Sequence, residues 1–191
     1  MLKHLSRPIC LALSTLLLAT GCSEDPLPTA APAEFNPIEP WSGSFSGLSV
    51  ATTDAFPCPA GTTASSRLTG TATLGYLGLA TITVRNCNRV LGATAAQARV
   101  QVEGLLATIA FSAGDTLFAE GSGYQVGDRN CTALSEFNNN FTMTRGTGRF
   151  ARYTGTATAI GTQVSSACPA TNSPPPLTTV ATISGVLFNK Q

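Results

Sequence analysis

The chain has 191 residues, of which 11% are charged, and its 11 basic and 10 acidic side chains give a formal net charge of +1. Because an ordinary soluble domain is about 25% charged, this sequence is poor in charge. The near-zero balance excludes a strongly basic surface for nucleic acid or anionic membranes, and a hydrophobic content of 43% excludes a disordered chain. The length suggests a single folded domain.

Residues 1–21 have the features of a signal peptide that is removed from the mature protein. A basic head of Lys3, His4 and Arg7 precedes an apolar stretch over 9–19. This stretch is shorter than the roughly 20 apolar residues that a membrane-spanning helix needs, and no later segment meets that requirement. We therefore expect the chain to be exported and cleaved.

The signal segment ends in the letters LATGC at Cys22, which resemble the lipobox of bacterial lipoproteins. In that motif small residues precede a cysteine that is acylated, with palmitate among its acyl chains, and becomes the mature N-terminus. The usual Leu three positions before the cysteine is here Ala19, with Leu18 one step earlier. Because Ser23 rather than Asp follows the cysteine, the resemblance implies an outer-membrane lipoprotein of the cell envelope, facing the periplasm or the surface. The alternative is an ordinary secreted protein with Cys22 as a spare thiol.

Loss of residues 1–21 changes the chemistry that the chain can perform. His4 is the only histidine, and without Lys3 and Arg7 nine basic and ten acidic side chains remain, a formal charge of −1. Histidine is the commonest general base and metal ligand. Its absence excludes Ser-His-Asp and Cys-His catalysis and histidine-based metal sites. We expect no metal and no cofactor.

Residues 22–40 are predicted to be a lipidated N-terminus followed by a proline-rich tether. The prolines of this segment are Pro26, Pro28, Pro32, Pro37 and Pro40. Such a composition is typical of a semi-extended spacer rather than of folded structure. The folded domain is therefore expected to cover 41–191.

After the tether, short runs of Thr, Val, Ile and Phe are broken by turn residues, and none has a 3.6-residue apolar period, so helices are not expected. Alternation predicts strands, as where Phe137, Asn139, Phe141 and Met143 share one face. A turn is expected at 113–115. The predicted strands are 42–52, 67–76, 78–86, 100–112, 116–126, 133–144, 153–164 and 177–188.

These strands predict an all-β fold, a small antiparallel β-barrel of about eight strands with local connections. The interior of such a barrel is just wide enough to be filled by side chains or to hold one small ligand. The alternative is a β-sandwich, whose typical Cys…Trp…Cys spacing is missing because Trp41 precedes every cysteine of the folded domain.

Four cysteines remain for disulfides in an exported chain, Cys58, Cys87, Cys131 and Cys168, and no C-x-x-C motif supports a zinc or redox site. If each neighbouring pair of strands is a hairpin, all four lie in loops at one end. Pairing of Cys58 with Cys87 and of Cys131 with Cys168 is then our first choice. The closed-barrel alternative is Cys87–Cys131 with Cys58–Cys168. The first choice fails if 67–86 is a single bent strand.

The letters GTGRFA at 146–151, followed by Thr154-Gly155-Thr156, resemble a signature of bacterial exported calycin-like proteins, whose barrel is similar to that of plant allene oxide cyclases and dirigent proteins. Two weaker matches lie upstream in the expected order, GTATLG at 70–75 and SAGDTL at 112–117. The first lacks a histidine that often precedes the Leu-Gly pair, and the second has Ala-Gly-Asp in place of Asn-Gly-Asp. The resemblance covers about 42–188 and implies a calycin-like barrel.

The rim motif within that signature is predicted to have a structural role. Its residues are Gly146, Thr147, Gly148, Arg149 and Phe150. The two glycines permit a sharp turn at a barrel rim, where the phenyl ring can plug the end and the guanidinium can meet a carboxylate or loop carbonyls. The alternative is an anion or substrate contact made by Arg145, Arg149 and Arg152.

Two residues are candidates for a catalytic role, Glu120 and Glu136. No segment of the sequence matches a catalytic motif of the plant enzymes, so the resemblance does not imply their activity for this chain. Glu120 and Glu136 lie on adjacent predicted strands, with Asn138 and Asn140 nearby, and an inward carboxylate with a raised pKa could do acid–base work. The alternation of neighbouring residues such as Phe137 instead favours an outward position for these polar groups.

We therefore interpret the chain as an outer-membrane-anchored lipoprotein whose barrel binds a small apolar molecule or acts as an envelope surface module, and not primarily as an enzyme. The expected partners are the membrane, through the lipid anchor, and a small hydrophobic ligand, with no nucleic acid. The alternatives are a dirigent- or cyclase-like enzyme acting on a hydrophobic substrate and a purely structural interaction domain. The sequence indicates no oligomeric state.

Overall fold

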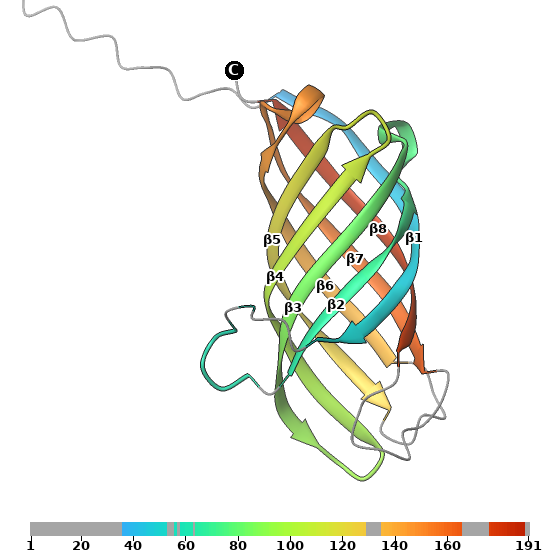
Figure 1. The fold of residues 1–191 in the computed structure, drawn as a ribbon, viewed down its shortest axis with the longest axis vertical. Helices are drawn as coiled ribbons and strands as arrows, with labels where there is room; N and C mark the ends of the chain where they lie inside the picture. The colour runs from blue at the N-terminus through green and yellow to red at the C-terminus, as the bar shows by residue number, and fades with distance from the viewer. Residues whose placement is uncertain are drawn as a thin grey trace, which may run out of the picture. The chain divides into compact units, whose positions relative to one another are not determined.

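Eight antiparallel strands form a closed β-barrel in which each strand pairs with the next and β8 returns to β1 (Figure 1). The structure, a computed structural model, describes residues 36–52, 56, 58–62, 64–128, 135–165 and 176–189. The strands are β1 Asn36–Ala51, β2 Ala64–Thr73, β3 Leu79–Ala93, β4 Gln97–Phe111, β5 Thr116–Asp128, β6 Ser135–Gly146, β7 Tyr153–Ser165 and β8 Leu177–Asn189, with 3-10 turns η1 Gly75–Leu77 and η2 Gly148–Phe150. The predicted barrel is confirmed, and the β-sandwich alternative is not needed.

Several predicted sites lie outside the described residues. They are the signal segment 1–21, the lipidation site Cys22, most of the tether, and the cysteines Cys131 and Cys168.

The beginning of the barrel differs from the prediction, because β1 begins at Asn36 and not after the tether. Residues 36–38 pair with the end of β8, in register from Asn36 opposite Asn189, and the pairing shifts by a bulge between Ile38 and Trp41. Pro40 lies in this shift, where a residue without an N–H group does not interrupt a ladder hydrogen bond. The pairing of residues 41–49 with β8 closes the barrel, and residues 36–38 extend this ladder over the last residues of β8, whose edge would otherwise be unpaired.

β2 and β3 are a true hairpin and not one bent strand. The one-turn helix η1 joins them, with Gly75 at φ 54° and Gly78 at φ 96°. These positive φ values favour glycine because they cost a side chain steric strain. The chain therefore reverses at 74–78, as the preferred cysteine pairing required.

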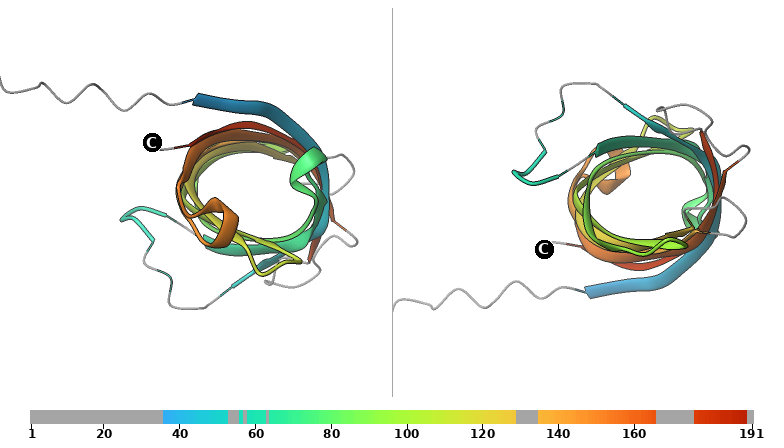
Figure 2. Two further views of the ribbon diagram at one scale, coloured as in Figure 1. Left: turned by 90° about the horizontal axis from the view of Figure 1, so that it is seen from above. Right: turned by 90° about the horizontal axis from the view of Figure 1, so that it is seen from below.

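The two ends of the barrel are built differently. The turns η1, β4–β5 and η2 gather at one end, which we call the plugged end (Figure 1, top). Large apolar side chains fill this end, among them Leu74, Leu117 and Leu187, each at most 1% exposed. The β1–β2 and β3–β4 connections lie at the other end, which we call the open end (Figure 1, bottom), and the views from above and below show the strands as one closed ring (Figure 2).

Many inward positions of the barrel carry small residues beside the large apolar ones. The buried alanines that face the interior are Ala72, Ala80, Ala107, Ala119, Ala157 and Ala159. Because successive side chains of a strand point to opposite faces, the inward residues of each strand form one alternating set. Register places glycines in the same sets, with Gly47 opposite Gly70 and Gly121 opposite Phe141. This choice of residues leaves space inside the barrel.

Candidate functional site

The rim motif forms part of the plugged end. Gly146 ends β6, and the next residues turn through η2, which places Phe150 inside the barrel at 3% exposure. Its ring lies 4.9 Å from that of Phe111 and 6.0 Å from that of Tyr153, measured between centroids. The predicted role of Phe150 as a plug is in accord with this packing.

Arg149 connects three turns of the plugged end. Its Nε lies 3.2 Å from Oδ2 of Asp115 in the β4–β5 turn, and its Nη2 donates a hydrogen bond of 2.6 Å to the carbonyl oxygen of Leu77 in η1. The backbone N–H of Arg149 also donates to Oδ1 of Asp115 at 3.1 Å. The guanidinium carbon lies 4.7 Å from the centre of the Phe150 ring. This side chain therefore meets both a carboxylate and a loop carbonyl, as the structural interpretation predicted.

The three arginines of the alternative interpretation do not converge on one site. Arg145 lies over the ring of Phe118 at 4.1 Å on the outer face, whereas Arg149 is engaged with Asp115 and Leu77. Arg152 is exposed in the turn after η2. The geometry thus favours the structural role of the motif over an anion site.

A cavity of about 330 Å³ occupies the barrel between the plugged end and the open end. Its walls are mostly apolar, and they come from inward residues of all eight strands. Aromatic and sulfur-containing residues of the wall include Trp41, Phe45, Phe137, Phe141 and Met143. No Asp, Glu, Lys or Arg is among the described residues that line it. The cavity can therefore hold a molecule without a charge more readily than an ion.

Neutral polar side chains surround the cavity toward the open end. We call these residues the polar collar: Ser49, Ser66, Asn86, Asn88, Gln125 and Gln163. Five of the six are joined by hydrogen bonds within two separate groups, one of Ser66, Asn86 and Asn88 and one of Gln125 and Gln163. Oγ of Ser66 donates to Oδ1 of Asn86 at 2.9 Å, Nδ2 of Asn86 donates to Oδ1 of Asn88 at 2.8 Å, and Nε2 of Gln125 donates to Oε1 of Gln163 at 2.9 Å. These neutral polar groups make a wettable entrance to an apolar interior.

The two candidate acid–base residues face away from the cavity. Glu120 and Glu136 are exposed, whereas their chain neighbours Ala119 and Phe137 are buried and line the cavity. The catalytic alternative depended on an inward carboxylate, and neither glutamate supplies one. The outward position favoured by the alternation of the sequence is the one observed.

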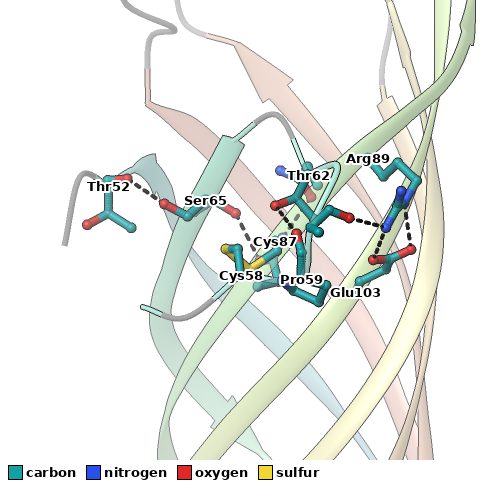
Figure 3. Close-up of a disulfide and its surroundings, with 12 residues drawn as sticks. Thr52, Cys58, Pro59, Thr62, Ser65, Cys87, Arg89 and Glu103 are labelled. Carbon is teal, nitrogen blue, oxygen red and sulfur yellow. Dashed lines mark hydrogen bonds and ion pairs between the residues drawn. A yellow bond between two sulfur atoms is a disulfide. The ribbon is translucent and has the colours of Figure 1, made fainter. Parts of the chain in front are cut away.

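The predicted disulfide between Cys58 and Cys87 is present, with Cα atoms 5.6 Å apart (Figure 3). The alternative pairing of Cys87 with Cys131 and of Cys58 with Cys168 is therefore wrong. The placement of Cys87 in a loop was also wrong, because this residue lies within β3. Its neighbours Asn86 and Asn88 line the cavity, so Cys87 faces outward, and it is nevertheless 0% exposed. The disulfide thus holds the β1–β2 loop against the outer wall.

An ion pair beside the disulfide holds the same loop. Nε and Nη2 of Arg89 on β3 bond to Oε1 and Oε2 of Glu103 on β4 at 2.9 and 3.0 Å, and Nη2 also donates to the carbonyl oxygen of Ala60 at 2.9 Å (Figure 3). The hydrogen bond from Arg89 lowers the pKa of the Glu103 carboxyl below its ordinary value of 4.5, and the reciprocal interaction raises the pKa of Arg89. Two strands and one loop thereby share a single charge network at the open end.

Two further findings concern the described part of the chain. It contains no cluster of three or more His, Cys, Asp or Glu side chains that could hold a metal ion. Among these residues no helix has the length and apolar character needed to cross a membrane.

Searches of protein families, of curated proteins and of solved structures find no match to this chain. The resemblance to exported calycin-like proteins therefore depends on the quoted motifs, and that family assignment stays a prediction.

Proposed function

We propose that this protein is a lipid-anchored envelope protein whose barrel binds one small, uncharged and mainly apolar molecule. The observation that carries the proposal is the cavity of about 330 Å³ with no ionisable side chain among its described wall residues. Pockets for small molecules measure about 300–1,000 Å³ and are lined mostly by apolar groups with a few polar ones. The cavity meets this description at the lower end of the range.

The side chains that border the cavity support binding over a purely structural role. A barrel of this size can be filled completely by side chains. Buried voids cost stability, roughly 24 cal/mol per Å³ in a measured series of core variants, so a core with no other task is expected to be filled. Here Ala107 and Ala159 border the space, where larger apolar side chains would fill it. The retained space favours a ligand as the missing part of the core.

The polar collar supports access from the open end. Its residues are all Ser, Asn or Gln, so a ligand can pass them without breaking an ion pair. An enzyme is the weaker candidate, because Glu120 and Glu136 are exposed on the outer face.

The test of binding is native mass spectrometry of the mature protein isolated from its own host envelope, followed by titration with neutral apolar probes. We expect a bound small molecule, and micromolar or tighter affinity for a probe that fits the cavity. An unoccupied protein that also binds no apolar probe would contradict the proposal.

The anchor is proposed from the lipobox-like sequence that ends at Cys22. More than one acyl chain at this residue would make membrane attachment stable, and the following prolines would space the barrel from the surface. We expect labelled palmitate to be incorporated into the wild-type protein and not into Cys22→Ala. Equal labelling of the two proteins would overturn the anchor and leave the binding proposal untouched.

A further inference from the structure

The cavity is closed toward the plugged end and reaches the surface at the open end. Phe111, Leu117 and Phe150 fill the plugged end, each at most 5% exposed, and none of them lines the cavity. At the open end the lining includes Val90, which is 48% exposed near the end of β3. A ligand that enters at the open end therefore meets a closed apolar floor.

The cavity is elongated along the barrel. Its lining runs from Ile82 to Val90 on β3 and from Ala157 to Gln163 on β7. At about 3.3 Å per residue and a strand tilt of about 35–45°, these stretches correspond to roughly 15–20 Å along the barrel axis. A volume of about 330 Å³ spread over such a length is longer than it is wide. The shape therefore suits a linear molecule better than a globular one.

The polarity of the wall changes along this length. On the plugged side of the collar the lining is apolar, with residues such as Phe45, Ile109 and Met143. Asn139 is an exception in sequence, but its Oδ1 is buried and lies where it would collide with a Cβ added to Gly123 on β5, so this atom is turned to the strand and not to the space. A ligand with one apolar and one polar end therefore fits with its apolar end innermost.

Two collar residues, Gln125 and Gln163, are placed to bind the polar end. They come from β5 and β7, on either side of β6, and both are half-buried residues that line the cavity. Nε2 of Gln125 donates to Oε1 of Gln163 at 2.9 Å, and Nε2 of Gln163 donates to Oγ1 of Thr179 at 3.2 Å. A primary amide has two N–H donors and two acceptor lone pairs, so these bonds leave capacity on both amides for a ligand.

We propose that the ligand is a neutral linear amphiphile, an alkyl or alkenyl chain with an uncharged hydroxyl or amide head, and that it is bound tail first with its head at Gln125 and Gln163. This inference rests on the proposed function and adds to it the shape, orientation and head group of the ligand. A hydroxyl group can donate to an amide oxygen and accept from an amide N–H. An ionised head would find no opposite charge on the described wall.

The shape is tested by calorimetric titration of the mature protein with straight-chain primary alcohols from hexan-1-ol to dodecan-1-ol. We expect the affinity to rise about fourfold with each added methylene group, and to stop rising once the tail reaches the plugged end. Adamantan-1-ol, a compact cage alcohol with as many carbon atoms as decan-1-ol, is expected to bind more weakly than decan-1-ol.

The tail-first orientation is tested by a variant on the plugged side of the collar. Ala107→Leu places carbon atoms in the deep part of the cavity, so we expect the affinity to stop rising at a shorter alcohol than in the wild type. The matched control is Ala110→Leu, which adds the same atoms on the exposed outer face of β4 and is expected to leave the series unchanged.

The head group is tested with octan-1-ol, 1-chlorooctane and octanoate at neutral pH, which share one chain length. We expect octan-1-ol to bind about tenfold more tightly than 1-chlorooctane, which corresponds to one net hydrogen bond, and more tightly than octanoate. Gln125→Leu is expected to remove the advantage over 1-chlorooctane, and Gln163→Leu is the second variant if the first does not fold, as judged by circular dichroism. Gln101→Leu, between the lining residues Val100 and Val102 and so on the outer face, is the control and should keep the advantage.

The outcomes separate the two proposals. If neither the straight-chain alcohols nor adamantan-1-ol binds, the proposed function fails. If adamantan-1-ol binds at least as tightly as decan-1-ol, or if affinity does not depend on chain length, ligand binding stands and the linear shape is overturned. An unchanged preference for octan-1-ol in the folded glutamine variants would overturn the position of the head, and tighter binding of octanoate than of octan-1-ol would overturn its neutral character.

Discussion

At the scale of single residues, Arg149 explains how one end of the barrel is closed. Its guanidinium meets Asp115 and the carbonyl of Leu77 and lies over the ring of Phe150, and these residues belong to three separate turns. The planar fork of arginine can bond to two partners while it stacks on a ring, which a lysine ammonium cannot do.

We predict that Arg149→Ala lowers the free energy of unfolding by about 1–3 kcal/mol, measured by urea denaturation. The ion pair with Asp115 contributes little of this, because the arginine side chain is 50% exposed. Most of the effect arises because the carbonyl of Leu77 loses its hydrogen-bond donor and because the rings of Phe111 and Phe150 lose their contact with the guanidinium. The control is Arg145→Ala, whose exposed contact with Phe118 is worth about 0.5–1 kcal/mol. Equal losses in the two variants would contradict the bridging role of Arg149.

A second prediction at this scale concerns the pH dependence of stability. Because Arg89 lowers the pKa of Glu103 below 4.5, the ion pair stabilises the folded state above that pH, and this contribution disappears as the pH falls through the folded-state pKa. The wild-type protein should therefore lose more unfolding free energy on acidification below pH 4.5 than Glu103→Gln does. Denaturation curves at neutral and acid pH measure the difference. Glu120→Gln controls for the loss of a carboxylate, and an identical pH profile for wild type and Glu103→Gln would refute the linkage.

At the scale of elements, the β1–β2 loop is held to the barrel wall by covalent and polar contacts together. The disulfide ties Cys58 to β3, and the hydrogen bond from Arg89 to the carbonyl of Ala60 holds the loop two residues further on. Oγ of Ser65 at the start of β2 also donates to the carbonyl of Thr52 at 2.6 Å. The loop is thus attached at both of its ends and in its middle.

We predict that replacing both Cys58 and Cys87 by Ser lowers the free energy of unfolding by about 2–4 kcal/mol, because the bond closes a chain segment with a sequence separation of 29. Denaturation under non-reducing conditions measures this loss. The wild-type protein treated with a reductant is the matched comparison and should approach the variant. Peptide mapping that joined Cys58 to a different cysteine would contradict the assignment.

The elements also show where sequence reasoning succeeds. Alternation and turn residues predicted all eight strands, and most of the predicted ends lie within a few residues of the observed ones. The largest difference at the start of a strand is in β1, because Pro37 and Pro40 are typical of a spacer when only local sequence is considered. Their pairing with β8 depends on contacts between the two ends of the chain, which local patterns do not contain.

At the scale of the whole molecule, the cavity is the property on which function depends. It is the space that the inward side chains of all the strands together leave unfilled, and no single residue creates it. Replacement of one small inward residue by a larger one should therefore affect stability and binding in opposite directions.

We predict that Ala107→Leu raises the free energy of unfolding of the ligand-free protein by about 1 kcal/mol and weakens the binding of an apolar probe. Ala107 is 5% exposed and lines the cavity, so the added carbon atoms enter empty space. Ala110→Leu, which places the same side chain on the exposed outer face of β4, is the control and should alter neither quantity appreciably. A strong loss of stability in Ala107→Leu would mean that the space is smaller than described.

The candidate site was predictable only in part. The sequence places Asn139 on one face with Phe137, Phe141 and Met143, and that face lines the cavity. It also favoured an outward position for Glu120 and Glu136, which is observed. The polar collar had no signal in the sequence, because its hydrogen bonds join residues of different strands.

The sequence by itself therefore determined the all-β class, the order of the strands and the turns of the rim motif, and it left the partner of Cys58 open between two schemes. These features follow from alternation and turn residues, which are local and readable along the chain. Only the tertiary structure decided that the barrel is hollow, that Cys58 is paired with Cys87, that Cys87 is buried under the β1–β2 loop, and that the cavity wall has no charge among its described residues. The physical reason is that the volume left empty inside a barrel, and the set of residues that border it, depend on how side chains from all eight strands pack together in space.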